Sequence, residues 1–154
     1  MSAPAWNDDF EELLLAFEQT GVEFVVVGAH AMAVQGVPRA TGDLDVRVRP
    51  SPDNARRVVA ALEAFRAPIQ AHGITADDFC EPGTVDQMGL PPRRIDVLTS
   101  ITGVDFDTAW STRVLAGPNG RRPFLGRAAL LANKRATARP KDLADVALLE
   151  ATGE

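Results

Sequence analysis

The sequence predicts an α/β fold, in the wider α+β sense, with a small mixed β-sheet, flanking helices and a helical C-terminal end. Three observations predict it. The apolar run Phe24–Val27 is typical of a buried strand, because β-branched residues favour strands. The run Asp43–Val48 alternates polar and apolar residues, which is the pattern of a half-buried strand. Several flanking segments repeat apolar residues at helical spacing and have helix-capping residues at their ends.

The composition is that of one globular domain, which we take as residues 1–154. Hydrophobic residues make up 45% of the chain and charged residues 24%, so a core can form. The net charge of −5 argues against binding nucleic acid by broad charge neutralisation. The single cysteine, Cys80, allows no intramolecular disulfide, and neither a signal-peptide pattern nor a membrane-length apolar run is present. We therefore expect a cytoplasmic protein with no membrane contact.

The first predicted helix ends near Thr20. Asp8 or Asp9 is expected to cap its start, and Gly21 is suited to the position after its end. Its apolar residues recur at i, i+3, i+4 and i+7 and form one face: Phe10, Leu13, Leu14 and Phe17.

Turn residues separate the elements that follow. Gly28 ends the first strand, and 36–38 (Gly-Val-Pro) stops a helix expected over 29–35. After the second strand, Ser51 is placed to cap a helix with Pro52 at its first position. The apolar stripe of this helix is Val58, Val59, Leu62 and Phe65.

The middle of the chain is predicted to be a loop followed by two short strands. Residues 67–82 contain turn formers, with Thr75 as the cap of a short helix. The strands are expected at 84–88 and 93–98, separated by a proline-containing turn.

The C-terminal third is predicted to hold a hairpin between helices. A helix over 104–112 precedes two short apolar runs, and Asn119-Gly120 between these runs favours a hairpin turn. Gly126 leads into a helix ending near residue 139, and Pro140 opens the last helix. We expect the core side of that last helix to be Leu143, Val146 and Ala147.

Two carboxylates in the second strand indicate a metal-binding site. Asp43 and Asp45 are two residues apart, so their side chains leave the same face of the strand. Side-by-side carboxylates repel unless a cation joins them, and Mg²⁺ prefers oxygen ligands. The turn at Gly28 begins a helix, where free N–H groups and the helix dipole favour phosphate. Together these features imply a nucleoside triphosphate.

A third carboxylate, Asp96, lies between Ile95 and Val97 in the later strand. A carboxylate inside an apolar strand is costly unless it is satisfied. One interpretation is an ion pair with Arg94 or another neighbour. The other, which we favour because an aspartate pair is already present, is the third carboxylate of the same metal site.

These residues carry a resemblance to a known family. The set Gly28, Arg39, Thr41, Asp43 and Asp45 resembles the signature of the nucleotidyltransferase superfamily, the polymerase-β-like fold. Its pattern is a strand, a Gly-Gly or Gly-Ser turn, a helix, then Asp-x-Asp on the next strand and a third Asp later. The forms R-x-T-x-D-x-D and K-x-x-x-x-R-x-K-D-x-x-D resemble the minimal bacterial and abortive-infection (AbiEii-type toxin) members. The resemblance spans roughly residues 22–149.

The resemblance implies metal-dependent transfer of a nucleoside monophosphate from NTP to an acceptor. Mg²⁺ or Mn²⁺ would be held by Asp43, Asp45 and Asp96, and Asp96 would also accept the acceptor's proton. Asp142 would orient Lys134 or the attacking group. The acceptor would be RNA, such as tRNA, or a protein, and the chain would be the toxin of a toxin–antitoxin or phage-defence pair, with an antitoxin protein as partner. The nucleotide-binding residues would be Gly28, Ala29, His30, Arg39, Thr41, Lys134 and Asp142.

One departure from the family pattern concerns the residues after Gly28, which are Ala29 and His30 instead of a second Gly or a Ser. Ala29 lacks a phosphate-binding hydroxyl. His30 either replaces it with an imidazole donor or is simply a helix-start residue. A second class of function is therefore a catalytically decayed module of this fold that acts by nucleotide or protein binding.

A third interpretation is a generic α/β protein whose aspartate pair is solvated. It leaves the clustering of the glycine, arginine and three aspartates unexplained. Outside the family, the C-terminal charges would be an ordinary surface, with Lys141 and Asp145 as an i,i+4 pair.

Overall fold

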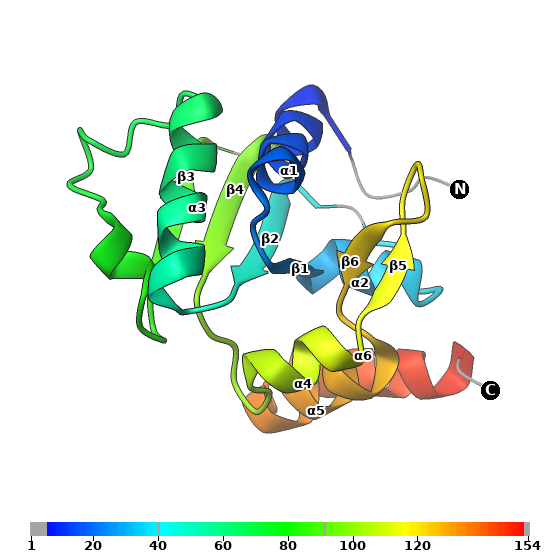
Figure 1. Cartoon of the computed structure of the whole chain (residues 1–154). Coiled ribbons are helices and arrows are strands. Elements are labelled where there is room, and N and C mark those ends of the chain that lie inside the picture. The colour runs from blue at the N-terminus through cyan, green and yellow to red at the C-terminus, as the bar shows by residue number, and fades with distance from the viewer. Residues whose placement is uncertain (1–5, 40, 91, 153–154) are drawn as a thin grey trace.

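The computed structural model describes residues 6–39, 41–90 and 92–152. Its strands form one mixed sheet in the order β3-β4-β2-β1-β6-β5 (Figure 1). Central strand β2 pairs antiparallel with β1 and parallel with β4. The strands are β1 (Phe24–Val27), β2 (Asp43–Val48), β3 (Val85–Met88), β4 (Arg94–Leu98), β5 (Val114–Ala116) and β6 (Arg122–Phe124).

Helices pack on both faces of this sheet, which confirms the predicted fold class. In Figure 1, α4, α5 and α6 gather at the opposite end of the molecule from α1. The helices are α1 (Asp8–Thr20), α2 (Gly28–Val34), α3 (Pro52–Ala64), the 3₁₀ helix η1 (Ala76–Phe79), α4 (Phe106–Ser111), α5 (Arg127–Thr137) and α6 (Pro140–Thr152).

Strand alternation divides the interior into two cores. Val26 and Val46 face α1 and α3, while Val25 and Val27 face the side of α2, α5 and α6. The α1 stripe is fully buried as predicted, in the first core: Phe10, Leu13, Leu14 and Phe17. Full burial of each such side chain contributes about 1.5–3 kcal/mol, so this stripe fixes α1 on the sheet.

The start of α1 differs from the prediction. Asn7, not Asp8 or Asp9, is the cap, and its side chain accepts a hydrogen bond from the Phe10 N–H at 3.1 Å. Asp8 and Asp9 lie in the first turn, where their charges favour the helix dipole. Gly21 follows the helix in the left-handed region (φ +78°), as expected.

The buried face of α6 also differs. Leu143 is half exposed and Ala147 is exposed, so the prediction that they face the core is wrong. Val146 is buried as expected. The reason is electrostatic: Asp142 and Asp145 turn inward to meet cationic side chains, and this rotates the two apolar residues toward solvent.

Other local predictions are confirmed. Ser51 caps α3 with Pro52 in the first turn, and Thr75 caps η1 through a reciprocal capping box. The hairpin forms between β5 and β6, and α4 begins after Asp105. Within the described ranges, no helix is long and apolar enough to cross a membrane.

Candidate active site

Three aspartates meet where β2 and β4 run side by side. Asp43 and Asp45 lie on one face of β2, and the parallel register pairs Asp45 with Asp96 and Asp43 with Arg94. Opposite residues on adjacent strands have side chains on the same face. We call Asp43, Asp45 and Asp96 the carboxylate cluster.

The cluster is electrostatically strained. Burial raises the pKa of Asp45 to about 6, with further contributions from the charges of Asp96 and Asp43 and a hydrogen bond with Asp96. The charge of Arg94 opposes this rise in pKa. Such an arrangement takes up a proton or a cation more readily than an isolated carboxylate does.

Arg94 forms an ion pair with Asp96, the third carboxylate of the cluster. Its Nε and Nη2 donate to the two carboxylate oxygens of Asp96, both at 3.0 Å. The ion pair considered from the sequence is therefore present. The same Asp96 also lies opposite Asp45, where a third metal ligand would be needed, so the two interpretations are not exclusive.

Gly28 makes room for the cluster. It has φ +70°, and a Cβ atom built on it would lie 2.5 Å from Oδ2 of Asp45. The β1–α2 turn therefore passes directly beside a cluster carboxylate. Ala29 is the half-buried second residue of α2, whose first turn has no side-chain cap, so its leading N–H groups lack that partner.

His30 faces α1. Its imidazole is 5% exposed and packs edge-on against Trp6 and Phe10, with ring centroids 5.1 and 5.7 Å away. Burial lowers its pKa, opposed by a hydrogen bond with the Asp43 backbone. Its Nε2 has no hydrogen-bond partner in the described part of the chain. This placement favours the helix-start alternative over the phosphate donor.

Thr41 acts on the backbone at the start of β2. Its hydroxyl accepts from the Asp43 N–H at 3.1 Å. It lies 3.3 Å from the carbonyl oxygen of Asp43, to which it donates. Thr41 therefore holds the first carboxylate-bearing residue in place, and the structure gives its side chain this local role.

A second group of charges joins the loop before β2 to the C-terminal helices. Asp145 accepts from Arg39 and lies 3.0 Å from Nζ of Lys134. Asp142 is 3.8 Å from the same Nζ and is held by Arg139. Both aspartates are almost completely buried. Lys134 and Arg39 are therefore brought together from distant parts of the sequence.

The pKa shifts in this group follow its contacts. Hydrogen bonds from Arg139 hold the pKa of Asp142 far below its usual range. Burial lowers the pKa of Lys134, although Asp142 partly compensates. Of the two aspartates, Asp145 lies closer to Nζ of Lys134, at 3.0 Å against 3.8 Å for Asp142.

Asp145 is the site-related residue that the sequence reasoning missed. The alternative of a surface pair between Asp145 and Lys141 does not hold, because Asp145 is buried and pairs with Arg39 and Lys134 instead. The available signal was its spacing of three residues from Asp142, which places both on one helical face.

The fit to a divalent cation rests on the carboxylate cluster. Among the residues that the structure describes, no three His, Cys, Asp or Glu side chains form a ready metal-binding group. Asp96 forms an ion pair with Arg94. Mg²⁺ commonly binds through one or two carboxylates, water and substrate phosphates, so the crowded Asp43 and Asp45 suit it without a complete protein cage.

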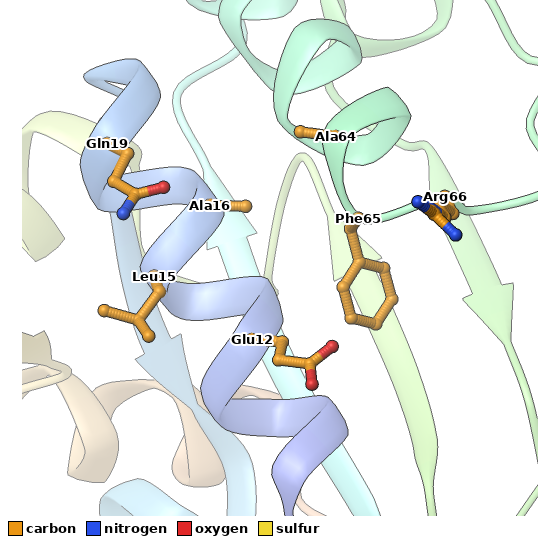
Figure 2. Close-up of a pocket in the computed structure, with 7 residues that line it drawn as sticks. All are labelled: Glu12, Leu15, Ala16, Gln19, Ala64, Phe65 and Arg66. Carbon is orange, nitrogen blue, oxygen red and sulfur yellow. The ribbon is translucent and has the colours of Figure 1, made fainter.

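A surface hollow of about 440 Å³ lies elsewhere, between α1 and the end of α3 (Figure 2). Figure 2 shows Glu12 and Ala16 on the side of α1 that faces Phe65. Because α1 and α3 cover the face of Val26 and Val46, this hollow is on the opposite face of the sheet from the carboxylate cluster. It takes no part in the site.

Comparison with known proteins supports the architecture. No protein-family model matches the chain, and no curated protein is a match. Among solved structures, it resembles a crystal structure from Thermotoga maritima described as a "putative nucleotidyltransferase (TM1012)". The match covers 92% of this chain and 88% of the other, with a TM-score of 0.53 and 14% identity. The chain therefore has a nucleotidyltransferase-like fold, as predicted.

Proposed function

We propose that this chain is a metal-dependent nucleotidyltransferase, which transfers a nucleoside monophosphate from NTP to an acceptor and releases pyrophosphate. The observation that carries the proposal is the pairing of Asp45 with Asp96, beside Asp43 and against the Gly28 turn. A nucleotidyltransferase-like fold supports it.

The carboxylates would hold the metal and manage a proton. Mg²⁺ or Mn²⁺ at Asp43, Asp45 and Asp96 would neutralise their charge and polarise phosphate oxygens. An acceptor oxygen would form a bond to the α-phosphorus as the bond to pyrophosphate breaks. Asp96, once released by Arg94, would take the proton from the acceptor oxygen.

The phosphates would be held by the second charge group. Arg39 and Lys134 present two cations that Asp145 keeps together. The backbone of Gly28 and Ala29 would approach the phosphates, because glycine leaves that turn open. These residues position the triphosphate and stabilise charge, which are the main protein contributions in phosphoryl transfer.

We propose RNA, such as tRNA, or a protein side chain as the acceptor. The net charge of −5 favours a small contact area over a broad RNA footprint. A cytoplasmic toxin controlled by an antitoxin protein is consistent with the sequence resemblance. Incubation with labelled NTP and total RNA or protein, with and without Asp45→Asn, would identify the acceptor class.

A second candidate is a module that binds nucleotide without turnover. The observation in its favour is the burial of His30 against Trp6 and Phe10, which leaves Ala29 with no replacement for the missing hydroxyl. This module would bind NTP and metal, or a protein partner, but would release no pyrophosphate.

Thermal unfolding with each NTP tests both candidates. At 100 times its dissociation constant, a ligand stabilises the native state by about 2.7 kcal/mol, which is a shift of several degrees. We expect a Mg²⁺-dependent shift that Asp45→Asn abolishes, each protein being compared with its own ligand-free state. Pyrophosphate release separates the enzyme from the binding module. An absence of any shift would overturn both nucleotide-based candidates.

A further inference from the structure

We propose that Arg94 is a built-in counter-cation of the carboxylate cluster, which competes with the metal for Asp96. In the metal-free protein Arg94 occupies Asp96, and this carboxylate becomes a ligand only when the guanidinium is released. The inference rests on the proposed function for its metal ion.

The ion pair between Arg94 and Asp96 has a geometry that hinders metal binding at Asp96. The guanidinium meets Asp96 through two parallel hydrogen bonds of 3.0 Å, an arrangement that neutralises a carboxylate effectively. Both oxygens of Asp96 accept a hydrogen bond from the guanidinium, so a metal ion that binds either oxygen would lie beside this positive charge. The Asp96 side chain is only 11% exposed, which limits competition from water.

The position of Arg94 in the sheet allows its side chain to move away from Asp96. It is the first residue of β4, and its N–H donates to the Gly42 carbonyl oxygen at 3.1 Å, so its backbone is held in the sheet. Its side chain is 32% exposed. The guanidinium can therefore leave Asp96 by a change of rotamer, with the strand register intact.

The charges of the cluster indicate where a first metal ion can bind. The carboxylate cluster holds three carboxyl groups, and Arg94 is the cation paired with one of them, so the cluster has more acidic than basic groups and suits a cation. In the ranges that the structure describes, Asp43 and Asp45 have no ion-pair partner within 4.0 Å, in contrast to Asp96. A first ion can thus bind at Asp43 and Asp45 while Arg94 still holds Asp96.

This order gives Arg94 a positioning role. It keeps Asp96 oriented across from Asp45 before the metal is complete. It also limits metal binding in the absence of substrate, because a second anion is needed to draw the guanidinium away. The triphosphate of a bound nucleotide is an anion of suitable chemistry.

The test is Mn²⁺ binding to the metal-free full chain, measured by calorimetry without nucleotide. We expect Arg94→Gln to bind Mn²⁺ about tenfold more tightly than the wild type, because a nearby positive charge is lost. Arg93→Gln is the matched control. It makes the same change in net charge at the adjacent residue, whose pair with Asp9 is exposed, and should alter the dissociation constant by at most about twofold.

A second variant covers a failure of Arg94→Gln to fold. Arg94→Lys keeps the charge but cannot form the paired hydrogen bonds, so its affinity for Mn²⁺ should lie between that of the wild type and that of Arg94→Gln. Tighter binding by Arg94→Gln or Arg94→Lys but not by Arg93→Gln supports the inference. Wild-type binding that the Arg94 variants leave unchanged or weaken overturns the inference alone. Absence of Mn²⁺ binding in every protein overturns it together with the proposed metal site.

Discussion

The carboxyl group of Asp45 occupies the space that a side chain at Gly28 would fill. A Cβ atom at position 28 would lie 2.5 Å from Oδ2 of Asp45, and Gly28 also has φ +70°. Two separate requirements for glycine therefore coincide at the turn between β1 and α2. One is set by the backbone and the other by a member of the carboxylate cluster.

Gly28→Ala should lower stability by more than its backbone strain alone. A non-glycine residue in the left-handed region of φ/ψ space lowers stability by about 1–2 kcal/mol, and the contact with Asp45 should lower it by about 1–3 kcal/mol more. Urea unfolding measures the sum. Gly73→Ala is the control, because Gly73 has nearly the same φ (+68°) and nothing within 4 Å of its added Cβ. Equal losses in the two variants would show that the contact with Asp45 is unimportant.

The raised pKa of Asp45 makes stability depend on pH. Its pKa is about 3.8 in the unfolded chain and about 6 in the fold, so between these values the folded state holds a proton that the unfolded state has lost. The contribution of Asp45 to stability is therefore full below pH 4 and falls as the pH rises to about 6, by about 3 kcal/mol.

Asparagine at position 45 isolates this effect. Asp45→Asn cannot ionise, so its advantage in melting temperature over the wild type should grow from pH 4 to pH 6.5 in the presence of a chelator. Circular dichroism melts at several pH values would measure it. A difference that stays constant across this range would contradict the strained carboxylate cluster.

Asp145→Asn should weaken both the fold and nucleotide binding. The change leaves Arg39 and Lys134 without their shared carboxylate. Loss of one partner of a buried pair costs about 3–5 kcal/mol, and the partial exposure of these cations reduces our expectation to about 2 kcal/mol. NTP affinity should fall about tenfold because the two cations lose their common orientation. Urea unfolding and fluorescent-nucleotide titration would measure the two effects.

Glu150→Gln is the control on the same helix. Its ion pair with Arg135 is about half exposed on both sides, so its loss should change stability by at most about 1 kcal/mol and leave NTP affinity unchanged. If the two variants behaved alike, Asp145 would have no special role.

Local patterns explain why much of the fold could be predicted. The helical spacing of Phe10 to Phe17 and the alternation in Asp43–Val48 each encode which face is buried. These signals need only neighbouring residues. The parallel pairing of β2 with β4 joins distant segments, so no local pattern predicts the approach of Asp96 to Asp45. It was expected from the aspartate pair already present and from the family resemblance.

Long-range contacts explain what the sequence reasoning missed. On α6, apolar residues alone favoured Leu143 and Ala147 for the core, but the cations on α5 and in the loop before β2 draw Asp142 and Asp145 inward. His30 likewise depends on α1, since its aromatic neighbours come from a segment some twenty residues earlier. The spacing of Asp142 and Asp145 places both on one helical face, but no local pattern shows which cations they contact or that His30 packs against Trp6 and Phe10.

The position of His30 predicts that Ala29, not His30, limits phosphate binding. His30→Leu should leave NTP affinity within about twofold of the wild type, because the imidazole packs on Trp6 and Phe10. Its stability should change by about 1 kcal/mol, since the lost backbone contact is offset by removal of a buried nitrogen without a partner. Ala29→Ser supplies a hydroxyl at the start of α2 and should raise NTP affinity several-fold. Nucleotide titration of both variants decides the matter. A large loss of affinity in His30→Leu, with its fold intact, would return the imidazole to the phosphate site.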